Sequence, residues 1–167
     1  FNESFAKQVV TKSMHIIEGE SVFIYTVCDA LDLAEAIALE CDLAGAKPLV
    51  ATFSDEYMRK SLTMPNEKFV ESTPKHWLKA IEATDAYVGI GRPALAEVPV
   101  PRIGARMSGR KPLSDAMDKK GVRWVGISYP TPKRAEESGV TLTKFKNAIL
   151  SALDIDYEEL AKEGRSI

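Results

Sequence analysis

The spacing of apolar residues changes along the chain, and each change predicts a different element. Near the start, apolar residues recur at helical spacing and predict an amphipathic helix over residues 3–18, which Gly19 ends. Residues 21–28 are instead almost continuously apolar and rich in β-branched and aromatic side chains, the pattern of a strand covered on both faces. Residues 48–53 form a second such buried strand. By the same criteria, further strands are predicted over residues 85–90 and 122–128, and further helices over residues 30–44, 74–84, 142–153 and 157–163.

Polar residues that cap helices support these boundaries. Ser54, followed by two acidic residues, supplies side-chain oxygens for the free amides of a helix N-terminus. The Thr-Pro pairs at residues 73–74 and 131–132 each join a capping residue to a proline suited to the first helical turn. Asp156 and Glu159 have the spacing of a capping box before the last helix.

The regular alternation of strands and helices predicts the class of fold. Strands that are joined through helices pair in parallel by right-handed crossovers, and the helices cover the faces of the sheet. We therefore expect an α/β three-layer sandwich with a mostly parallel sheet of about four to five strands and helices on both faces. The whole of residues 1–167 is expected to form a single domain. Residues 92–114, which contain four prolines, are expected to be a long and partly helical excursion.

The strand over residues 122–128 carries a tryptophan whose burial can be predicted. A strand covered on both faces buries both of its alternating sets of side chains, so Trp124 is expected under a flanking helix. Tyr129 lies just beyond this strand, on the rim of the sheet where an interface with another domain is expected. We therefore expect Trp124 to matter more for stability than Tyr129.

Composition narrows the classes of function. The chain of 167 residues has a formal net charge of −2 and a pI near 5.8, which argues against a nucleic-acid partner. Its two cysteines, Cys28 and Cys41, do not make a secreted disulfide framework. There is no apolar run near the ~18 residues of a membrane span and no signal peptide, so we expect a cytoplasmic protein. Because the chain starts at Phe1 and ends just past a charged segment, we also expect it to be part of something longer.

The residues that commonly carry catalysis or bind metals are sparse. Two histidines occur, His15 and His76, each in a separate predicted helix, and no spacing typical of zinc ligands includes them. The nucleophile motif Gly-x-Ser-x-Gly is absent, and Ser128 at a strand end is followed by Tyr-Pro rather than by a sharp turn into glycine. The sequence therefore predicts no catalytic, cofactor-binding or metal-ligating residue in this chain.

The strand ends, where open parallel sheets bind ligands, hold polar residues but no phosphate-binding loop. The turn after the first strand contains Asp29 and Asp32 and no glycine, so its carboxylates would face a phosphate. Gly89 and Gly91 form a lone Gly-x-Gly, a pattern more typical of glycines that ease a strand end. Cys28 lies beside these carboxylates, which would raise its pKa, and is expected to be a structural thiol like the other cysteine.

A basic segment is the remaining candidate for binding. Residues 98–114 contain no acidic residue and four basic ones: Arg102, Arg106, Arg110 and Lys111. The three arginines are spaced four apart and would share one face of a helix. Such a face could clamp a carboxylate or phosphate, or meet an acidic partner surface. A solvated charged face is the simpler interpretation.

The order of several segments resembles that of a known family. The segments that carry the resemblance are residues 18–24, 44–46, 54–59, 123–127, 129–131, 135, 157–161 and 164–165. In this order and spacing, from about residue 5 to 166, they resemble the N-terminal domain of the thermophilic metalloaminopeptidase family, which includes aminopeptidases T and S.

This resemblance implies an exopeptidase that releases N-terminal residues from peptides with two divalent metal ions, zinc or cobalt. The metal ligands of the family lie in a C-terminal domain, and none of their motifs occurs here, so no catalytic residue is carried over to this chain. The implied partners are the protein's own C-terminal catalytic domain, peptide substrates and a second copy in a homodimer, with no nucleic acid or membrane.

Three hypotheses remain open from the sequence. The favoured one is a non-catalytic domain of a metalloaminopeptidase. The second is the equivalent domain of a related iron-dependent dihydroxypyridine dioxygenase. The third is a stand-alone α/β module that binds a small anion through the rim of the sheet and the stripe from Arg102 to Arg110.

Overall fold

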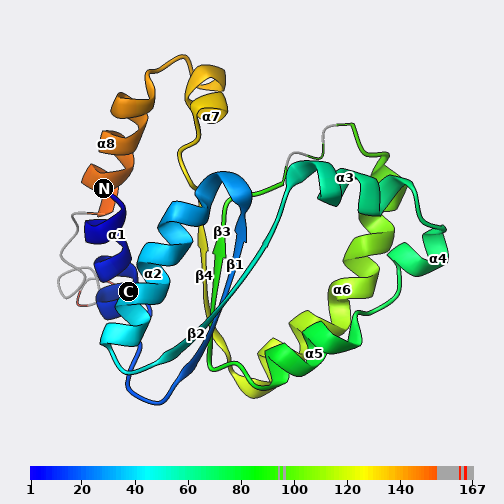
Figure 1. Ribbon diagram of the computed structural model, residues 1–167, viewed down its shortest axis with the longest axis horizontal. Coiled ribbons are helices and arrows are strands. Elements are labelled where there is room, and N and C mark those ends of the chain that lie inside the picture. The colour runs from blue at the N-terminus through cyan, green and yellow to red at the C-terminus, as the bar shows by residue number, and fades with distance from the viewer. Residues whose placement is uncertain (94, 96, 154–161, 163, 165–167) are drawn as a thin grey trace.

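A four-stranded, all-parallel sheet forms the centre of the computed structural model (Figure 1). The structure describes residues 1–93, 95, 97–153, 162 and 164. The strands pair in the order β2-β1-β3-β4, so β1 and β3 are central and β2 and β4 lie at the edges of the described sheet. The predicted parallel pairing is confirmed for strands β1 (Ser21–Val27), β2 (Lys47–Phe53), β3 (Ala86–Ile90) and β4 (Arg123–Ile127).

Helices cover both faces of this sheet and confirm the predicted three-layer α/β sandwich (Figure 1). The chain moves from β1 to β2 in one direction across the sheet and from β2 to β3 to β4 in the other. Right-handed crossovers then place the connecting helices on opposite faces. One face carries α1 (Asn2–Gln8), the π-helical turn η1 (Val9–Ser13) and α2 (Leu31–Leu43), which the short η2 (Cys28–Ala30) precedes. The opposite face carries α3 (Asp55–Thr63), α4 (Glu67–Val70), α5 (Lys75–Glu82) and α6 (Val100–Lys120), and the chain continues after β4 into α7 (Pro132–Glu137) and α8 (Leu142–Leu153).

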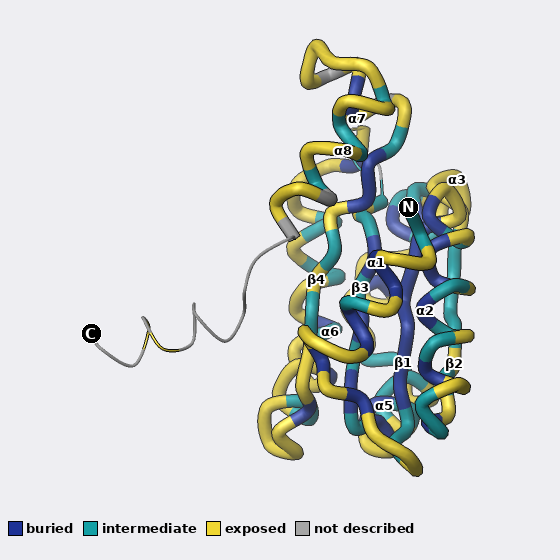
Figure 2. The backbone as a smooth tube through the Cα atoms, turned by 90° about the vertical axis from the view of Figure 1, so that its left-hand side faces the viewer, coloured by how far each residue is buried: buried dark blue, intermediate teal, exposed yellow. Residues whose placement is uncertain are grey.

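The two faces of the sheet have different chemistry because side chains alternate along β1. Ile24 points into an aliphatic core with Leu33 and Ile37 of α2, and all three are fully buried. Phe23 and Tyr25 point to the other face, into a smaller cluster with aromatic neighbours. Figure 2 shows β1 buried along its length, as expected for a strand covered on both faces.

The first helix is shorter than predicted. Instead of a helix over residues 3–18, α1 passes into η1 and ends at Ser13. Met14 and Ile16 still reach the same core as the helix, so the apolar spacing continues past the point where the backbone leaves the helix. His15 between them has a positive φ of 47°, and it lies after the first helix rather than in it.

Of the four predicted caps, two are confirmed, one is wrong, and that of Asp156 lies outside the described residues. The Ser54 hydroxyl accepts a hydrogen bond from the Tyr57 amide at 3.1 Å, and the Thr131 hydroxyl accepts one from the Arg134 amide at 3.3 Å. The cap expected from Thr73 is wrong, because α5 starts one residue later and the N-cap position is occupied by a proline that makes no side-chain cap. The predicted helix over residues 157–163 lies outside the described residues apart from single positions.

The strand over residues 48–53 and Trp124 were both expected to be buried, and both expectations are wrong. β2 is an edge strand with partly exposed side chains, and its Leu49 is 55% exposed. Trp124 lies on the opposite edge strand, β4, and is 67% exposed. It shares the face of Phe23 and Tyr87, but α6 packs against α3, α4 and α5 rather than over β4. A continuous apolar pattern therefore did not distinguish an edge strand from a central one.

Tyr129, expected on the rim at an interface with another domain, is already buried within this chain, with 5% of its surface exposed. Its hydroxyl donates a hydrogen bond to the Asp32 carboxylate, with 2.8 Å between the oxygens. The same carboxylate accepts hydrogen bonds from the side-chain amide of Asn2 at 2.7 Å and from the backbone amide of Leu33 at 2.9 Å. Asp32 therefore joins the first helix, the start of α2 and the segment after β4.

The pKa values of this pair follow from the contacts. Burial, together with the hydrogen bond to Asp32, raises the pKa of Tyr129 to about 12. Partial burial by itself would raise the pKa of Asp32, but the hydrogen bonds from Tyr129, Asn2 and Leu33 outweigh it and lower that pKa below the ordinary range. The carboxylate is thus held in its ionised form.

Mutation can test whether Tyr129, rather than Trp124, contributes to the stability of the fold. Trp124→Ala should change the free energy of unfolding by no more than about 0.5 kcal/mol, because the side chain is exposed. Tyr129→Phe should cost about 1 kcal/mol, because it removes a hydrogen bond to a charged but water-accessible group. Urea denaturation of both variants measures the difference. A loss of about 3 kcal/mol or more in Trp124→Ala would show that this side chain is covered in solution.

The lowered pKa of Asp32 predicts a pH dependence. The pKa of an aspartate in the unfolded chain is about 3.9. A carboxylate whose pKa is lower than this in the folded protein contributes its full stabilisation above that pH. The stabilisation is lost as the pH falls through the pKa of the folded state. Wild type should therefore be more stable than Asp32→Asn at about pH 6, and the difference should shrink towards about pH 3. Denaturant melts at both pH values check this. A difference that stays constant would mean that the carboxylate titrates normally.

Replacing two glycines of α6 by alanine should have different effects on stability, because only one of them, Gly109, lies against another segment. A Cβ at this position would collide with the backbone carbonyl group of Glu71, with its carbon at 2.7 Å, where the segment after α4 meets α6. Gly109→Ala should therefore destabilise the protein by about 1–3 kcal/mol. Gly104→Ala is the matched control on the same helix, since its Cβ would meet nothing within 4 Å. That control should be neutral or stabilising by up to about 1 kcal/mol. Thermal melts that show equal effects would contradict the close approach.

Candidate functional site

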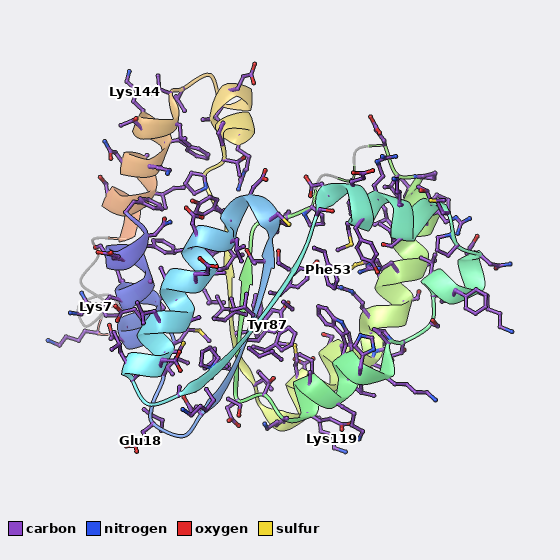
Figure 3. All side chains as sticks on the ribbon, viewed as in Figure 1. Lys7, Glu18, Phe53, Tyr87, Lys119 and Lys144 are labelled. Atoms are coloured by element: carbon purple, nitrogen blue, oxygen red, sulfur yellow. The ribbon has the colours of Figure 1, made fainter. Side chains whose placement is uncertain are left out.

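A pocket of about 250 Å³ lies on the face of the sheet that α3, α4, α5 and α6 cover. Phe53, at the end of β2, forms its strand side, and Tyr57 and Trp77 contribute from α3 and α5. Arg106 and Arg110 of α6 also line it. Figure 3 shows the side chains of Phe53 and Tyr87 on the side of the sheet that faces these helices. The pocket therefore brings together residues from one strand and several helices.

Aromatic rings make one side of this pocket. The ring centroids of Trp77 lie 5.5 Å from those of Tyr25 and 5.4 Å from those of Phe23, both in edge-on geometry. Phe53 stacks on Tyr57 at 5.3 Å. The period of β1 explains the cluster, because alternate residues of the strand place both of its aromatic side chains on this face. Such rings present flat apolar faces on which a planar ligand can stack.

Two arginines of the stripe predicted from spacing, Arg106 and Arg110, line the pocket, and the stripe is not a fully solvated face. All three arginines are half-buried. Arg102 donates a hydrogen bond to the carbonyl of Pro65 at 2.7 Å, so it holds the chain between α3 and α4. Arg110 lies over the rings of Trp77 and Tyr25, 5.2 Å and 5.7 Å from their centroids. Lys111 is exposed and pairs with Asp115.

The charge of Arg106 and Arg110 has no acidic counterpart among the described residues of the pocket. No aspartate or glutamate is among the described residues that line it. Among the described residues, no ion pair joins Arg106 or Arg110 to a carboxylate. Burial lowers the pKa of Arg106, and the positive charge of Arg110 lowers it further. The two arginines therefore form a cationic wall whose charges are partly desolvated and repel each other.

The polar residues at the strand ends do not join this pocket. Cys28 is exposed, and its sulfur accepts a hydrogen bond from the Thr52 hydroxyl at 3.7 Å. Gly91 has a φ of 73° and packs so closely on Val27 that a Cβ would lie 2.7 Å from the valine methyl group. Asp32 is used by the contacts described above. Cys28, Asp32 and Gly91 at the strand ends therefore serve packing and hydrogen bonding.

The remaining candidate residues are placed apart. Cys41 is buried in the aliphatic core, and burial raises its pKa to about 11. Both cysteines are free thiols. His15 is exposed and lies away from the pocket, whereas His76 of α5 is exposed and lines it. Sequence reasoning missed the aromatic wall, because Phe53, Tyr57 and Trp77 belong to three elements and only the fold brings them together.

The described residues do not fit a catalytic metal centre. In this part of the chain, no three histidine, cysteine, aspartate or glutamate side chains gather as metal ligands. A catalytic zinc site requires three such protein ligands, and a two-metal site requires more.

None of the helices described has both the length and the apolar character of a bilayer-spanning segment.

A known structure with the same fold is larger than this chain. AmpT from Thermus thermophilus is 20% identical, with a TM-score of 0.64 over 78% of this chain and 36% of that protein. The 2,5-dihydroxypyridine dioxygenase from Pseudomonas putida is 15% identical, with a TM-score of 0.48 over 78% of this chain and 35% of that protein. This chain thus spans about a third of their length.

Sequence comparison assigns the family. No curated protein matches the chain. The family model for thermophilic metalloproteases (M29), in contrast, matches residues 2–166. The match covers nearly all of the sequence and agrees with the resemblance found from its motifs. The chain therefore belongs to the thermophilic metalloprotease family (M29).

Proposed function

We propose that this chain is the N-terminal, non-catalytic domain of a metal-dependent aminopeptidase, which releases N-terminal amino acids from peptides. The observation that carries the proposal is the match of residues 2–166 to the metalloprotease family. The similarity of the fold to part of AmpT supports it, because the chain corresponds to 36% of that protein and leaves room for a further domain.

The distribution of possible ligands supports the non-catalytic role. Metal-dependent peptide hydrolysis uses a metal ion to activate water and to polarise the scissile carbonyl. The described residues gather no ligand set for this purpose. In the proposal, a C-terminal domain of the parent protein holds the two divalent ions, zinc or cobalt. The described residues of this chain form a parallel sheet and a pocket that are separate from this metal chemistry.

The same proposal covers partners and location. The partners are the catalytic C-terminal domain, the peptide substrates of the parent and a second copy in a homodimer, in the cytoplasm. A net charge of −2 supports the absence of a nucleic-acid partner. Light scattering of the full-length protein should give the mass of a dimer, and a monomer would remove that part of the proposal.

Activity measurements test the proposed function directly. The 167-residue chain should not hydrolyse aminoacyl-p-nitroanilides with added cobalt or zinc, because its described residues gather no set of metal ligands. The full-length product of its gene should do so, and a chelator should abolish the activity until metal is restored. Turnover by the short chain would overturn the non-catalytic role. A full-length protein that is inert towards peptides but consumes oxygen with 2,5-dihydroxypyridine and ferrous iron would instead be an oxygenase.

A further inference from the structure

The pocket described above has a cationic wall that has no charge partner among the described residues. Arg106 and Arg110 are half-buried and line the cavity, and no acidic residue among the described ones lines it with them. Burying cations is costly unless an anion compensates them. Two adjacent cations at a spacing of four on a helix also repel each other. An anion held between the two guanidinium groups would offset both costs.

We propose that this pocket binds an organic carboxylate attached to an aromatic ring. The carboxylate lies against Arg106 and Arg110, and the ring stacks among Phe53, Tyr57 and Trp77. This inference goes beyond the proposed peptidase function and does not depend on it, since it concerns binding by this chain alone.

The geometry of the cationic wall favours a carboxylate over a phosphate. Phosphate sites commonly use free backbone amides at a helix N-terminus or in a glycine-rich loop. Here the wall is formed by residues 106–110, in the middle of α6, where amides are bonded within the helix. Only the side-chain guanidinium forks remain, and such forks bind carboxylate and phosphate oxygens alike. The preference for a carboxylate therefore rests on the lack of free backbone amides along this part of α6.

The size and lining of the pocket favour a single ring. Its volume of about 250 Å³ is below the ~300–1,000 Å³ of sites for drug-sized ligands. The rings of Phe53 and Trp77 stack on each other, with 6.2 Å between their centroids and an angle of 23° between their planes, and together they form an apolar surface that lines the pocket. Arg110 already stacks on Trp77, so its guanidinium plane is oriented before a ligand arrives. Exposed Tyr57 and His76 mark the side open to solvent.

Two sources can supply this ligand chemistry. One is a small free aromatic acid, and the other is the C-terminal carboxylate of a peptide that ends in an aromatic residue. Isothermal titration of the purified chain distinguishes them. 3-Phenylpropionate represents the free acid, and the peptide Gly-Gly-Phe with a free carboxylate represents the peptide end. Binding of the first alone identifies small acids as the source, and binding of the peptide identifies C-terminal carboxylates. Binding of neither overturns the proposal.

A comparison of neutral and charged probes tests the role of the carboxylate in the unmodified protein. N-acetyl-phenylalanine should bind at a one-to-one ratio, and N-acetyl-phenylalanine amide should bind at least about tenfold more weakly. Acetate, which lacks the ring, should also bind at least about tenfold more weakly. Equal affinity for the acid and the amide, or for the acid and acetate, would overturn the proposal.

Variants of α6 test the arginines with a matched control. Arg106→Gln should weaken binding of N-acetyl-phenylalanine by about tenfold or more, and Arg110→Gln should act in the same direction. Lys119→Gln removes the same charge from an exposed position near the end of the helix, away from Phe53, and should leave affinity unchanged (Figure 3). Melting curves of each variant show whether it is folded. Wild-type affinity in folded Arg106→Gln, or an equal loss in Lys119→Gln, would overturn the proposal.

Discussion

The burial of β1 on both faces is the constraint on which the rest of the structure depends. Six of its seven residues are buried, and they alternate between two chemically different layers. Towards α2 the strand presents small aliphatic side chains such as Val22 and Ile24, which pack at high density. Towards α5 and α6 it presents Phe23 and Tyr25, whose large rings pack against Trp77 of α5. The pocket follows from this asymmetry.

The helix α6 shows how the aromatic layer affects neighbouring elements. The helix meets the α4 region so closely that Gly109 has no room for a side chain. On the adjacent turns, Arg106 and Arg110 reach back towards the aromatic residues, and burial raises the pKa of Tyr87 there to about 12. Contact with rings allows the charges to be partly buried, since the face of an aromatic ring attracts a cation. A cationic pocket beside a parallel sheet is the result.

On the aliphatic side, one carboxylate joins three parts of the chain. Asp32 accepts hydrogen bonds from Asn2 and Tyr129 as well as from the backbone of its own helix. The N-terminal helix and the segment after β4 are far apart in sequence, and this group brings them to the start of α2. A similar role falls to Arg123, which binds Glu20 and so connects the beginnings of β4 and β1. Both contacts stabilise the ends of strands rather than a binding site.

The sequence by itself determined the elements and the fold class. The spacing of apolar residues, together with capping residues, predicted all four strands and most helices, because these elements depend on local sequence. The alternation of strands and helices predicted the parallel three-layer architecture, because crossovers have a fixed hand. The spacing of Arg102, Arg106 and Arg110 likewise placed them on one helical face. Only the tertiary structure decided which strands lie at an edge, because apolar composition does not reveal what covers a strand. For that reason Trp124 is exposed and Tyr129 is buried, against expectation. Only the tertiary structure brought Phe53, Tyr57 and Trp77 together with the arginines in one pocket. These residues lie in distant parts of the chain and meet through packing, and the spacing of residues in a sequence carries no information about such packing.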